Sequence, residues 1–352
     1  MTCEGNGRAC VGTGFIVLDV VRSIAPNGSV ERRFAGGSCG NVLAILSYFG
    51  WMATAVGRIG NDDAGRELVR DLKKWGVLTE LLRVEEGRGT PVIIQENYVD
   101  SKGRHRHRFS RACPVCGASL PAYRPLLSSD AASTASHLPA HDVFYFDRVA
   151  PGTLELAQKS RSNGALVVFE PSGIKDERLF VECLQISHIV KYSNERISGA
   201  HDLVARAKAP VEIETLGAEG LRLRVRASGR VGSWRDLSAY AAPTLRDAAG
   251  SGDWCTAGIV QWIFGNGASV EELLHDADAV VEATRYGQAL AALNCGFEGA
   301  RGLMYALEAK SVLEMALAIV SGGDVPREVA PTPRRAKERR NDGTCAVCSS
   351  VL

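Results

Sequence analysis

Residues 247–265 read DAAGSGDWCTAGIVQWIFG, a Gly-Ser-Gly turn that leads into an apolar segment typical of a helix. Backbone N–H groups at the start of such a helix favour an anion, because the helix dipole is positive there. Asp253 follows the turn directly, so we expect a carboxylate beside this anion site. The pairing suits phosphoryl transfer, in which amides stabilise charge while a carboxylate takes a hydroxyl proton. The other interpretation is a glycine-rich loop in which Asp253 only caps the helix.

Strands and helices alternate along the rest of the chain. Apolar stretches predict strands, and segments with apolar residues three or four positions apart predict helices. The predicted strands lie at 9–21, 53–60, 90–100, 142–147, 165–173, 188–193 and 210–217. The helices between them are predicted at 41–50, 64–76 and 151–164, each ending near a glycine. This alternation predicts a three-layer α/β/α fold with a mostly parallel central sheet.

The composition is that of a soluble globular protein. The chain has 352 residues, of which 45% are hydrophobic and 23% charged, and its formal net charge is +1. A charge this close to neutral gives no support to nucleic acid as the main partner. The sequence contains no run of about 18 apolar residues, and its N-terminal stretch lacks the apolar core of a signal peptide. We therefore expect a cytoplasmic protein without a membrane partner.

Three further glycine-rich motifs precede the Gly-Ser-Gly turn. GGSCGN spans 36–41, GRIGNDDAG spans 57–65 and TLGAEGL spans 215–221. In this order, and together with DAAGSGD, they resemble the ribokinase-like (PfkB) family of sugar and nucleoside kinases. The resemblance runs from about residue 11 to about residue 310, and it implies a ribokinase-like fold and an ATP-dependent phosphotransferase. The sequence lacks the G-x-x-x-x-G-K-[ST] motif of P-loop kinases.

The resemblance also implies a role for each matching residue. Asp253 would be the general base, beside an anion hole formed by Ala249, Gly250, Ser251 and Gly252. The acceptor would be bound by Asp19, Gly37 and Asn41. The nucleotide would be bound by Thr215, Gly217, Gly220 and Asn294. Structural interpretations stay open, since Asp19 could cap a strand, Asn41 could cap a helix, and Asn294 fits either interpretation about equally.

The sequence departs from the family at the elements that help to place Mg²⁺. The family's Asn-x-x-Glu element corresponds to KYSNERI, where Ser193 and Arg196 occupy the two positions and Glu195 is a neighbouring substitute. The family's Asp-Pro-Asn appears as Glu170-Pro171-Ser172. Magnesium could still bind to nucleotide phosphates and water with few protein carboxylates. We therefore expect Mg²⁺ as a cofactor, with Glu195 as its candidate ligand.

A small β lid is implied by the resemblance, with strands at about 14–36 and 81–111. Its last part, SKGRHRHRFSR at 101–111, is strongly basic. In a strand, Arg104, Arg106 and Arg108 would share one face, which could meet an anionic substrate such as a phosphorylated acceptor. The alternative is a solvated edge strand that its charges protect from aggregation.

Two Cys-x-x-Cys pairs lie outside this pattern. ACPVCGASLP at 112–121 is typical of half a zinc knuckle, and TCAVCS at 344–349 supplies a second pair. Together Cys113, Cys116, Cys345 and Cys348 would complete a closed, structural tetrahedron of thiolates around Zn²⁺. The alternatives are a redox pair, a disulfide, a partial site, or pairs that meet another subunit in a homodimer.

These patterns predict a kinase domain over 1–324, a zinc-knuckle-like insertion at 111–122 and a Pro/Arg-rich tail over 325–352. The function they favour is an ATP-dependent kinase of a small sugar, nucleoside or related phosphorylated acceptor. The alternative is a catalytically weak kinase fold that serves as a zinc-containing module binding nucleic acid or protein. The basic lid and the Arg-rich tail support that alternative, and the intact GSGD argues against it.

Overall fold

The computed structural model describes residues 7–25, 28–101, 105–197, 202–204, 209–227, 229–265 and 269–323. Its centre is a ten-stranded sheet in the order β13-β12-β11-β10-β9-β8-β1-β4-β5, with β14 paired to β12. The strands are β1 (Ala9–Thr13), β4 (Met52–Gly60), β5 (Leu82–Glu85), β8 (Val143–Phe146), β9 (Leu166–Phe169), β10 (Ile189–Ser193), β11 (Val211–Thr215), β12 (Leu221–Ala227), β13 (Arg230–Val231) and β14 (Arg235–Leu237). Strands β11 to β5 pair in parallel, and only β12 to β14 run antiparallel.

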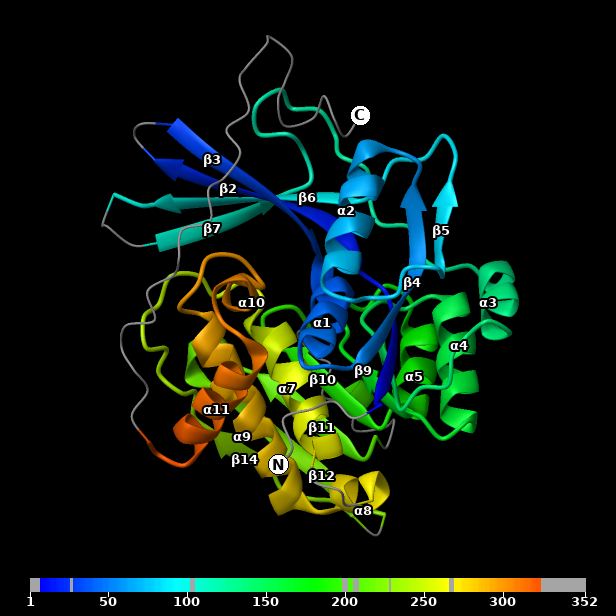
Figure 1. Ribbon diagram of the computed structural model, residues 1–352. Coiled ribbons are helices and arrows are strands. Elements are labelled where there is room, and N and C mark those ends of the chain that lie inside the picture. The colour runs from blue at the N-terminus through cyan, green and yellow to red at the C-terminus, as the bar shows by residue number, and fades with distance from the viewer. Residues whose placement is uncertain are drawn as a thin grey trace.

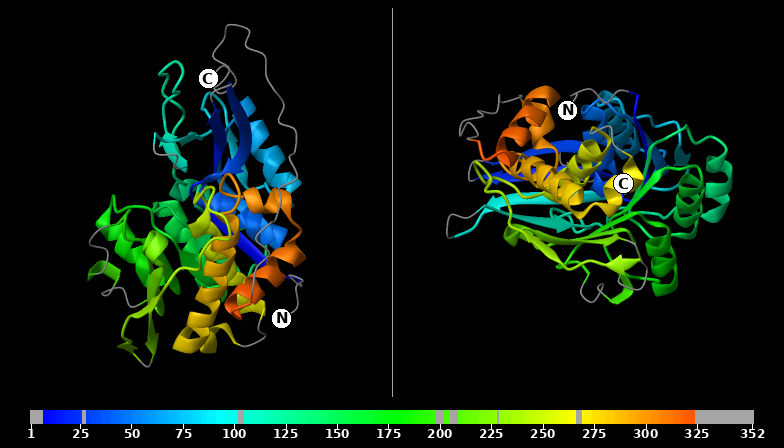
Figure 2. Two further views of the ribbon diagram at one scale, coloured as in Figure 1. Left: turned by 90° about the vertical axis from the view of Figure 1, so that its left-hand side faces the viewer. Right: turned by 90° about the horizontal axis from the view of Figure 1, so that it is seen from below.

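Helices cover both faces of this sheet. Those in the described part of the chain are α1 (Gly37–Tyr48), α2 (Asp63–Lys74), α3 (Ser128–Ala135), α4 (Pro151–Ser162), α5 (Glu177–Ile186), α7 (Ser251–Gly265), α8 (Val270–His275), α9 (Ala277–Asn294), α10 (Gly302–Ala306) and α11 (Ala309–Val320), with a 3-10 turn at Gly217–Glu219. Figures 1 and 2 show α3, α4 and α5 on one side and α1, α7, α9 and α11 on the other.

One hydrophobic core lies on each face of the sheet, between the sheet and the helices that cover it. Two cores form because neighbouring residues of a strand point to opposite faces. In β8, Tyr145 packs into the core beneath α1, α7 and α9, whereas Phe144 and Phe146 pack into the core beneath α3 to α5. The strands are therefore buried on both faces, as is usual for parallel sheets. The predicted three-layer α/β/α architecture with a mostly parallel sheet is confirmed.

A second, four-stranded sheet extends from this core in the order β3-β2-β6-β7. Its strands are β2 (Val17–Ala25), β3 (Gly28–Gly36), β6 (Val92–Val99) and β7 (His105–Ser110), and we call this sheet the lid (Figure 1). β5 does not belong to the lid, although the expected lid range began at residue 81. It pairs in parallel with β4 at the edge of the main sheet, where a half-exposed strand can carry the same charge-rich sequence.

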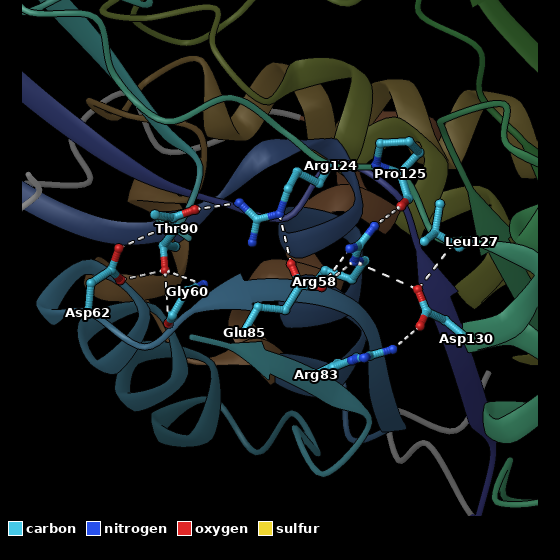
Figure 3. Close-up of polar contacts among 11 residues, drawn as sticks. Arg58, Gly60, Asp62, Arg83, Glu85, Thr90, Arg124, Pro125, Leu127 and Asp130 are labelled. Carbon is cyan, nitrogen blue, oxygen red and sulfur yellow. Dashed lines mark hydrogen bonds and ion pairs between the residues drawn. The ribbon is translucent and has the colours of Figure 1, made fainter. Parts of the chain in front are cut away.

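The GRIGNDDAG motif ties β4 and α2 to the chain that enters the lid (Figure 3). Asp62 accepts hydrogen bonds from the backbone N–H of Gly65, at 2.7 Å, and of Thr90, at 2.7 Å. Arg58 Nε donates to Glu85 Oε1 at 2.9 Å. Asp62 thus caps α2 and fixes the loop before β6, whereas Arg58 joins β4 to β5.

No helix in the described residues is both long and apolar enough to cross a membrane.

Candidate active site

Asp253 and Asn41 meet although 212 positions separate them in the chain. Asp253 lies in the first turn of α7 and Asn41 in the first turns of α1. Asn41 Nδ2 donates to Asp253 Oδ2 at 2.8 Å. Both side chains are buried, with 4% exposure for Asn41 and 8% for Asp253. The structure thus brings together the expected base and one expected acceptor-binding residue.

The surroundings of Asp253 hold its pKa near neutrality. Burial, and after it the negative charge of Glu170, raise the pKa of Asp253 from 3.8 to a net value of about 7. The hydrogen bond from Asn41 and the positive charges of Lys191 and Arg196 oppose this rise. A carboxylate that titrates near pH 7 is well matched to taking a proton from a hydroxyl group at neutral pH.

Glu170 and Lys191 form a buried ion pair beneath the Gly-Ser-Gly turn. A Cβ atom placed on Gly252 would lie 3.5 Å from Glu170 Oε1 and 3.6 Å from Lys191 Nζ. Thr256 Oγ1 also donates to Glu170 Oε2, at 2.6 Å. Burial disfavours the charge on Lys191, but Glu170 more than compensates and raises its pKa above 10.5. Lys191 therefore places a lasting positive charge next to the expected anion hole.

One feature of the sequence indicates this pair. Lys191 stands inside an otherwise apolar strand, β10, whose first four residues are all buried. A fully buried lysine is rare unless a carboxylate pairs with it. Its partner Glu170 stands where the family has the Asp of Asp-Pro-Asn.

The turn at 249–252 is shaped by glycine. Gly250 has φ +75°, and a Cβ there would meet Ala300 O at 2.2 Å. Asp247 Oδ1 accepts from the N–H of Ala249 at 2.9 Å. Asn294 Nδ2 donates to Ala249 O at 3.1 Å. Asn294 is fully buried and supports the turn from beneath, while its expected place beside the adenine stays a prediction.

The TLGAEGL motif forms a tight turn between β11 and β12. Gly217 has φ +61° and Gly220 has φ +112°, and a Cβ on Gly220 would meet Leu237 O at 2.1 Å. Thr215 ends β11, and its Oγ1 donates to Tyr192 O at 3.4 Å. Glu195 lies nearby, with Oε1 3.8 Å from where a Cβ of Gly217 would be. The exposed Glu195 is thus placed beside the expected nucleotide turn.

Asp19 and the Gly36–Gly37 pair form the other end of the site. A Cβ on Gly36 would lie 1.9 Å from Asp19 Oδ2, and Gly37 has φ +75°. Burial raises the pKa of Asp19 from 3.8 to about 7, although the charge of Arg301 and the N–H of Gly37 lower it. Asp19 and Asn41 line one cavity. Two of the three expected acceptor residues therefore line one cavity, and Asn41 connects it to the expected base.

Arginines of the lid form ion pairs with acidic side chains of the same sheet or its loops. Arg22 and Arg108 pair with Glu96 at 3.1 Å and 2.6 Å, and Arg106 pairs with Asp100 at 3.4 Å. Two of these three arginines share Glu96, so one positive charge remains in excess, but each guanidinium is already held by an acid of the lid. Arg104 lies outside the described residues.

The cysteine motif at 112–121 has the backbone of a tight knuckle. The N–H of Cys113 donates to Ala118 O at 2.8 Å, and the N–H of Gly117 donates to Cys113 O at 2.8 Å. Cys113 is buried and Cys116 is exposed. Cys345 and Cys348 lie outside the described residues. Across the described ranges, no group of three or more His, Cys, Asp or Glu residues could hold a metal ion.

The chain is similar to known carbohydrate kinases. Residues 19–305 match the family model described as pfkB family carbohydrate kinase. The bifunctional protein HldE of Paramagnetospirillum magneticum is 25% identical over 295 residues, which cover 78% of this chain. The match spans 59% of the length of that curated relative.

Two solved structures show the same fold. A ribokinase from Giardia lamblia has a TM-score of 0.67 and 17% identity, covering 87% of this chain and 99% of its own. A fructokinase from Xylella fastidiosa with bound ATP has a TM-score of 0.65 and 17% identity, covering 89% of this chain and 98% of its own. The expected ribokinase-like fold is confirmed.

Proposed function

Because the chain belongs to the pfkB family of carbohydrate kinases, we propose that it phosphorylates a hydroxyl of a small sugar or nucleoside with Asp253 as the general base. As a family member it is a phosphotransferase with an alcohol group as acceptor. One observation carries the finer proposal: the carboxylate of Asp253 is held by Asn41 at 2.8 Å, directly after a glycine turn at a helix N-terminus.

The chemistry proposed for these residues is general-base catalysis with electrostatic stabilisation. Asp253 takes the proton of the acceptor hydroxyl as the acceptor oxygen attacks the γ-phosphorus in line, the bond from that phosphorus to the β,γ-bridging oxygen breaks, and ADP leaves. The N–H groups of residues 249–252 and the start of α7 stabilise the charge on the transferred group. Lys191 adds a fixed positive charge beneath the turn, which Glu170 holds in place.

The nucleotide is proposed to be ATP, bound beside Thr215, Gly217 and Gly220. The fructokinase named above binds ATP, and the glycine turn after β11 allows a ligand to approach the backbone closely. Mg²⁺ would neutralise phosphate charge. The exposed carboxylates of Glu195 and of Glu219 lie beside or within this turn, and of these Glu195 is the proposed ligand, so phosphate and water oxygens would supply most of the coordination.

The acceptor is proposed to bind between Asp19, Gly37 and Asn41. These residues line or adjoin the cavity beside Asp253, and carboxylate and amide oxygens suit sugar hydroxyls. No observation favours the alternative of an inactive binding module, since the lid arginines in the described ranges are paired with acids.

A structural Zn²⁺ site is a separate part of the proposal. Backbone hydrogen bonds close one tight turn that contains Cys113 and Cys116; these two would supply two thiolates, and Cys345 and Cys348 the other two. The role of such a closed site would be to fasten the tail.

The experiment that tests the kinase proposal is a screen with ATP and Mg²⁺. Neutral sugars, sugar phosphates and nucleosides are offered separately, and products are identified by mass. A product 80 Da heavier than one acceptor supports the proposal, as does loss of this product in Asp253→Asn. Turnover by Asp253→Asn at the wild-type rate would remove Asp253 from the mechanism.

A further inference from the structure

Arg301 lines the cavity that contains Asp19 and Asn41, and no sequence motif pointed to it. The residue follows α9 and lies directly before α10. It is only 3% exposed. A buried arginine is normally fully engaged by acids or carbonyl groups, since burying an unpaired charge is costly.

Only one side of the Arg301 guanidinium is engaged by the fold. Nη2 donates to Asp71 Oδ2 at 2.6 Å and also to Ala35 O. Asp71 in turn accepts from the N–H of Ala35 at 2.9 Å. Arg301 and Asp71 together thus bind the carbonyl and the N–H of Ala35, directly before Gly36 and Gly37. Nη1 is buried and has no hydrogen-bond partner among the described residues.

Asn41, which lines the same cavity, also has a buried polar atom without a hydrogen-bond partner in the described residues. Asn41 Nδ2 is used by Asp253, but Asn41 Oδ1 is buried without a partner in the described ranges. Asp19 faces the same cavity, and the charge of Arg301 acts on it, yet no ion pair between Asp19 and Arg301 is found in the described structure. A donor, a neutral acceptor and a carboxylate therefore surround one space without satisfying one another.

The charges around the cavity favour a neutral ligand. Asp71 already pairs with Arg301, and Glu298 in the cavity wall pairs with Arg32 at 3.0 Å. Above its raised pKa of about 7, the carboxylate of Asp19 adds a negative charge, which would repel a phosphate or a carboxylate. A hydroxyl group suits both neighbours, because it donates to a carboxylate and accepts from a guanidinium N–H.

We propose that Arg301 is a specificity-determining residue whose Nη1 donates to an oxygen of a neutral vicinal diol on the acceptor, while Asp19 accepts from the same diol. The inference rests on the proposed kinase function and narrows its acceptor. A neutral polyol is bound at this position, and the phosphorylated acceptor that the basic lid suggested is excluded from it.

The test uses the neutral acceptor that the wild-type enzyme phosphorylates in the screen above, together with its single-deoxy analogues. Arg301→Gln raises the KM of this acceptor by about 10- to 100-fold, because a charged hydrogen bond is lost. Its kcat and the KM of ATP stay within about twofold. For the deoxy analogue that lacks the hydroxyl bound by Arg301, the KM is the same in Arg301→Gln and in the wild-type enzyme.

The control is Asp71→Asn, which weakens the contacts of Asp71 with Ala35 and Arg301 Nη2 but leaves Arg301 Nη1 in place. Its acceptor KM stays within about threefold of wild type, whereas a purely structural role predicts that Asp71→Asn and Arg301→Gln behave alike. If Arg301→Gln folds poorly, Arg301→Lys replaces it in the test. Lysine retains the positive charge but lacks the planar guanidinium group, so its acceptor KM should lie between those of the wild type and of a variant without the charge.

Three results would contradict the inference. The first is an unchanged acceptor KM in Arg301→Gln, and the second is an equal loss with every deoxy analogue. The third is a sugar phosphate preferred over the neutral sugar through Arg301, with salt-sensitive binding. If the wild-type enzyme phosphorylates no hydroxyl acceptor, the proposed function fails first and this inference with it.

Discussion

Asn41 Nδ2 lies 2.8 Å from Asp253 Oδ2, so one amide connects the base at the start of α7 with the cavity beside α1. The hydrogen bond stabilises the ionised carboxylate and lowers the pKa of Asp253, against burial and Glu170, which raise it to about 7. The amide can thus tune the base and orient the acceptor together.

Replacement of Asn41 should therefore shift the pH dependence of catalysis. The base acts when deprotonated, so wild-type kcat rises with pH to a plateau above about pH 7. Asn41→Leu removes a hydrogen bond to the charged form, and the midpoint moves to higher pH. A pH profile of kcat with saturating substrates measures this shift. A midpoint that moves to lower pH would contradict the assignment.

The Glu170–Lys191 pair should affect stability and activity separately. Lys191→Met leaves Glu170 buried without its partner and lowers the free energy of unfolding by about 3–5 kcal/mol. The double variant Lys191→Met/Glu170→Gln recovers much of that stability. Its kcat nevertheless stays low, because the positive charge beneath the turn is still missing. Denaturant unfolding and kcat of both variants test this. Full recovery of activity in the double variant would mean that Lys191 has only a structural role.

Gly250→Ala should damage the anion hole. Its φ of +75° and the predicted 2.2 Å approach of a Cβ to Ala300 O both exclude a side chain. Gly164→Ala is the matched control, because Gly164 has φ +89° but no atom within 4 Å of its Cβ position. The control loses only about 1–2 kcal/mol of stability. Gly250→Ala loses more and also loses kcat, as thermal melting and rate measurements would show. Equal effects in the two variants count against a shaped turn.

The zinc proposal predicts about one equivalent of Zn²⁺ in the purified full-length protein. Cys113→Ser should lower the zinc content, whereas Cys183→Ser should not, because Cys183 is buried in the other core. Elemental analysis of the three proteins decides between these outcomes. Less than about half an equivalent in the wild type, with no change in Cys113→Ser, rules out the site.

The layered fold could be predicted because doubly buried parallel strands leave an apolar pattern that alternates with helices. The placement of β5 could not, since Leu82–Glu85 is half exposed and an edge strand resembles a lid strand in sequence. Asp253 could be predicted from its place after the Gly-Ser-Gly turn and Asn41 from the ordered motifs, but the hydrogen bond between them depends on tertiary structure. The same holds for Lys191, Glu170 and Arg301, whose partners lie 21 or more positions away.

The central claim is that Asp253 is the general base, and Asp253→Asn tests it most directly. With ATP, Mg²⁺ and the acceptor found by the screen, kcat is expected to fall by about 10³-fold, while ATP binding measured by calorimetry stays within about threefold. Asp278→Asn serves as the control, since its side chain is 84% exposed on α9 and its kcat should not change. The Asp253→Asn variant should also have a higher melting temperature than the wild type at pH 8. The pKa of Asp253 is raised in the folded state, so its ionised form destabilises the fold above that pKa. A kcat for Asp253→Asn within tenfold of wild type would contradict the account.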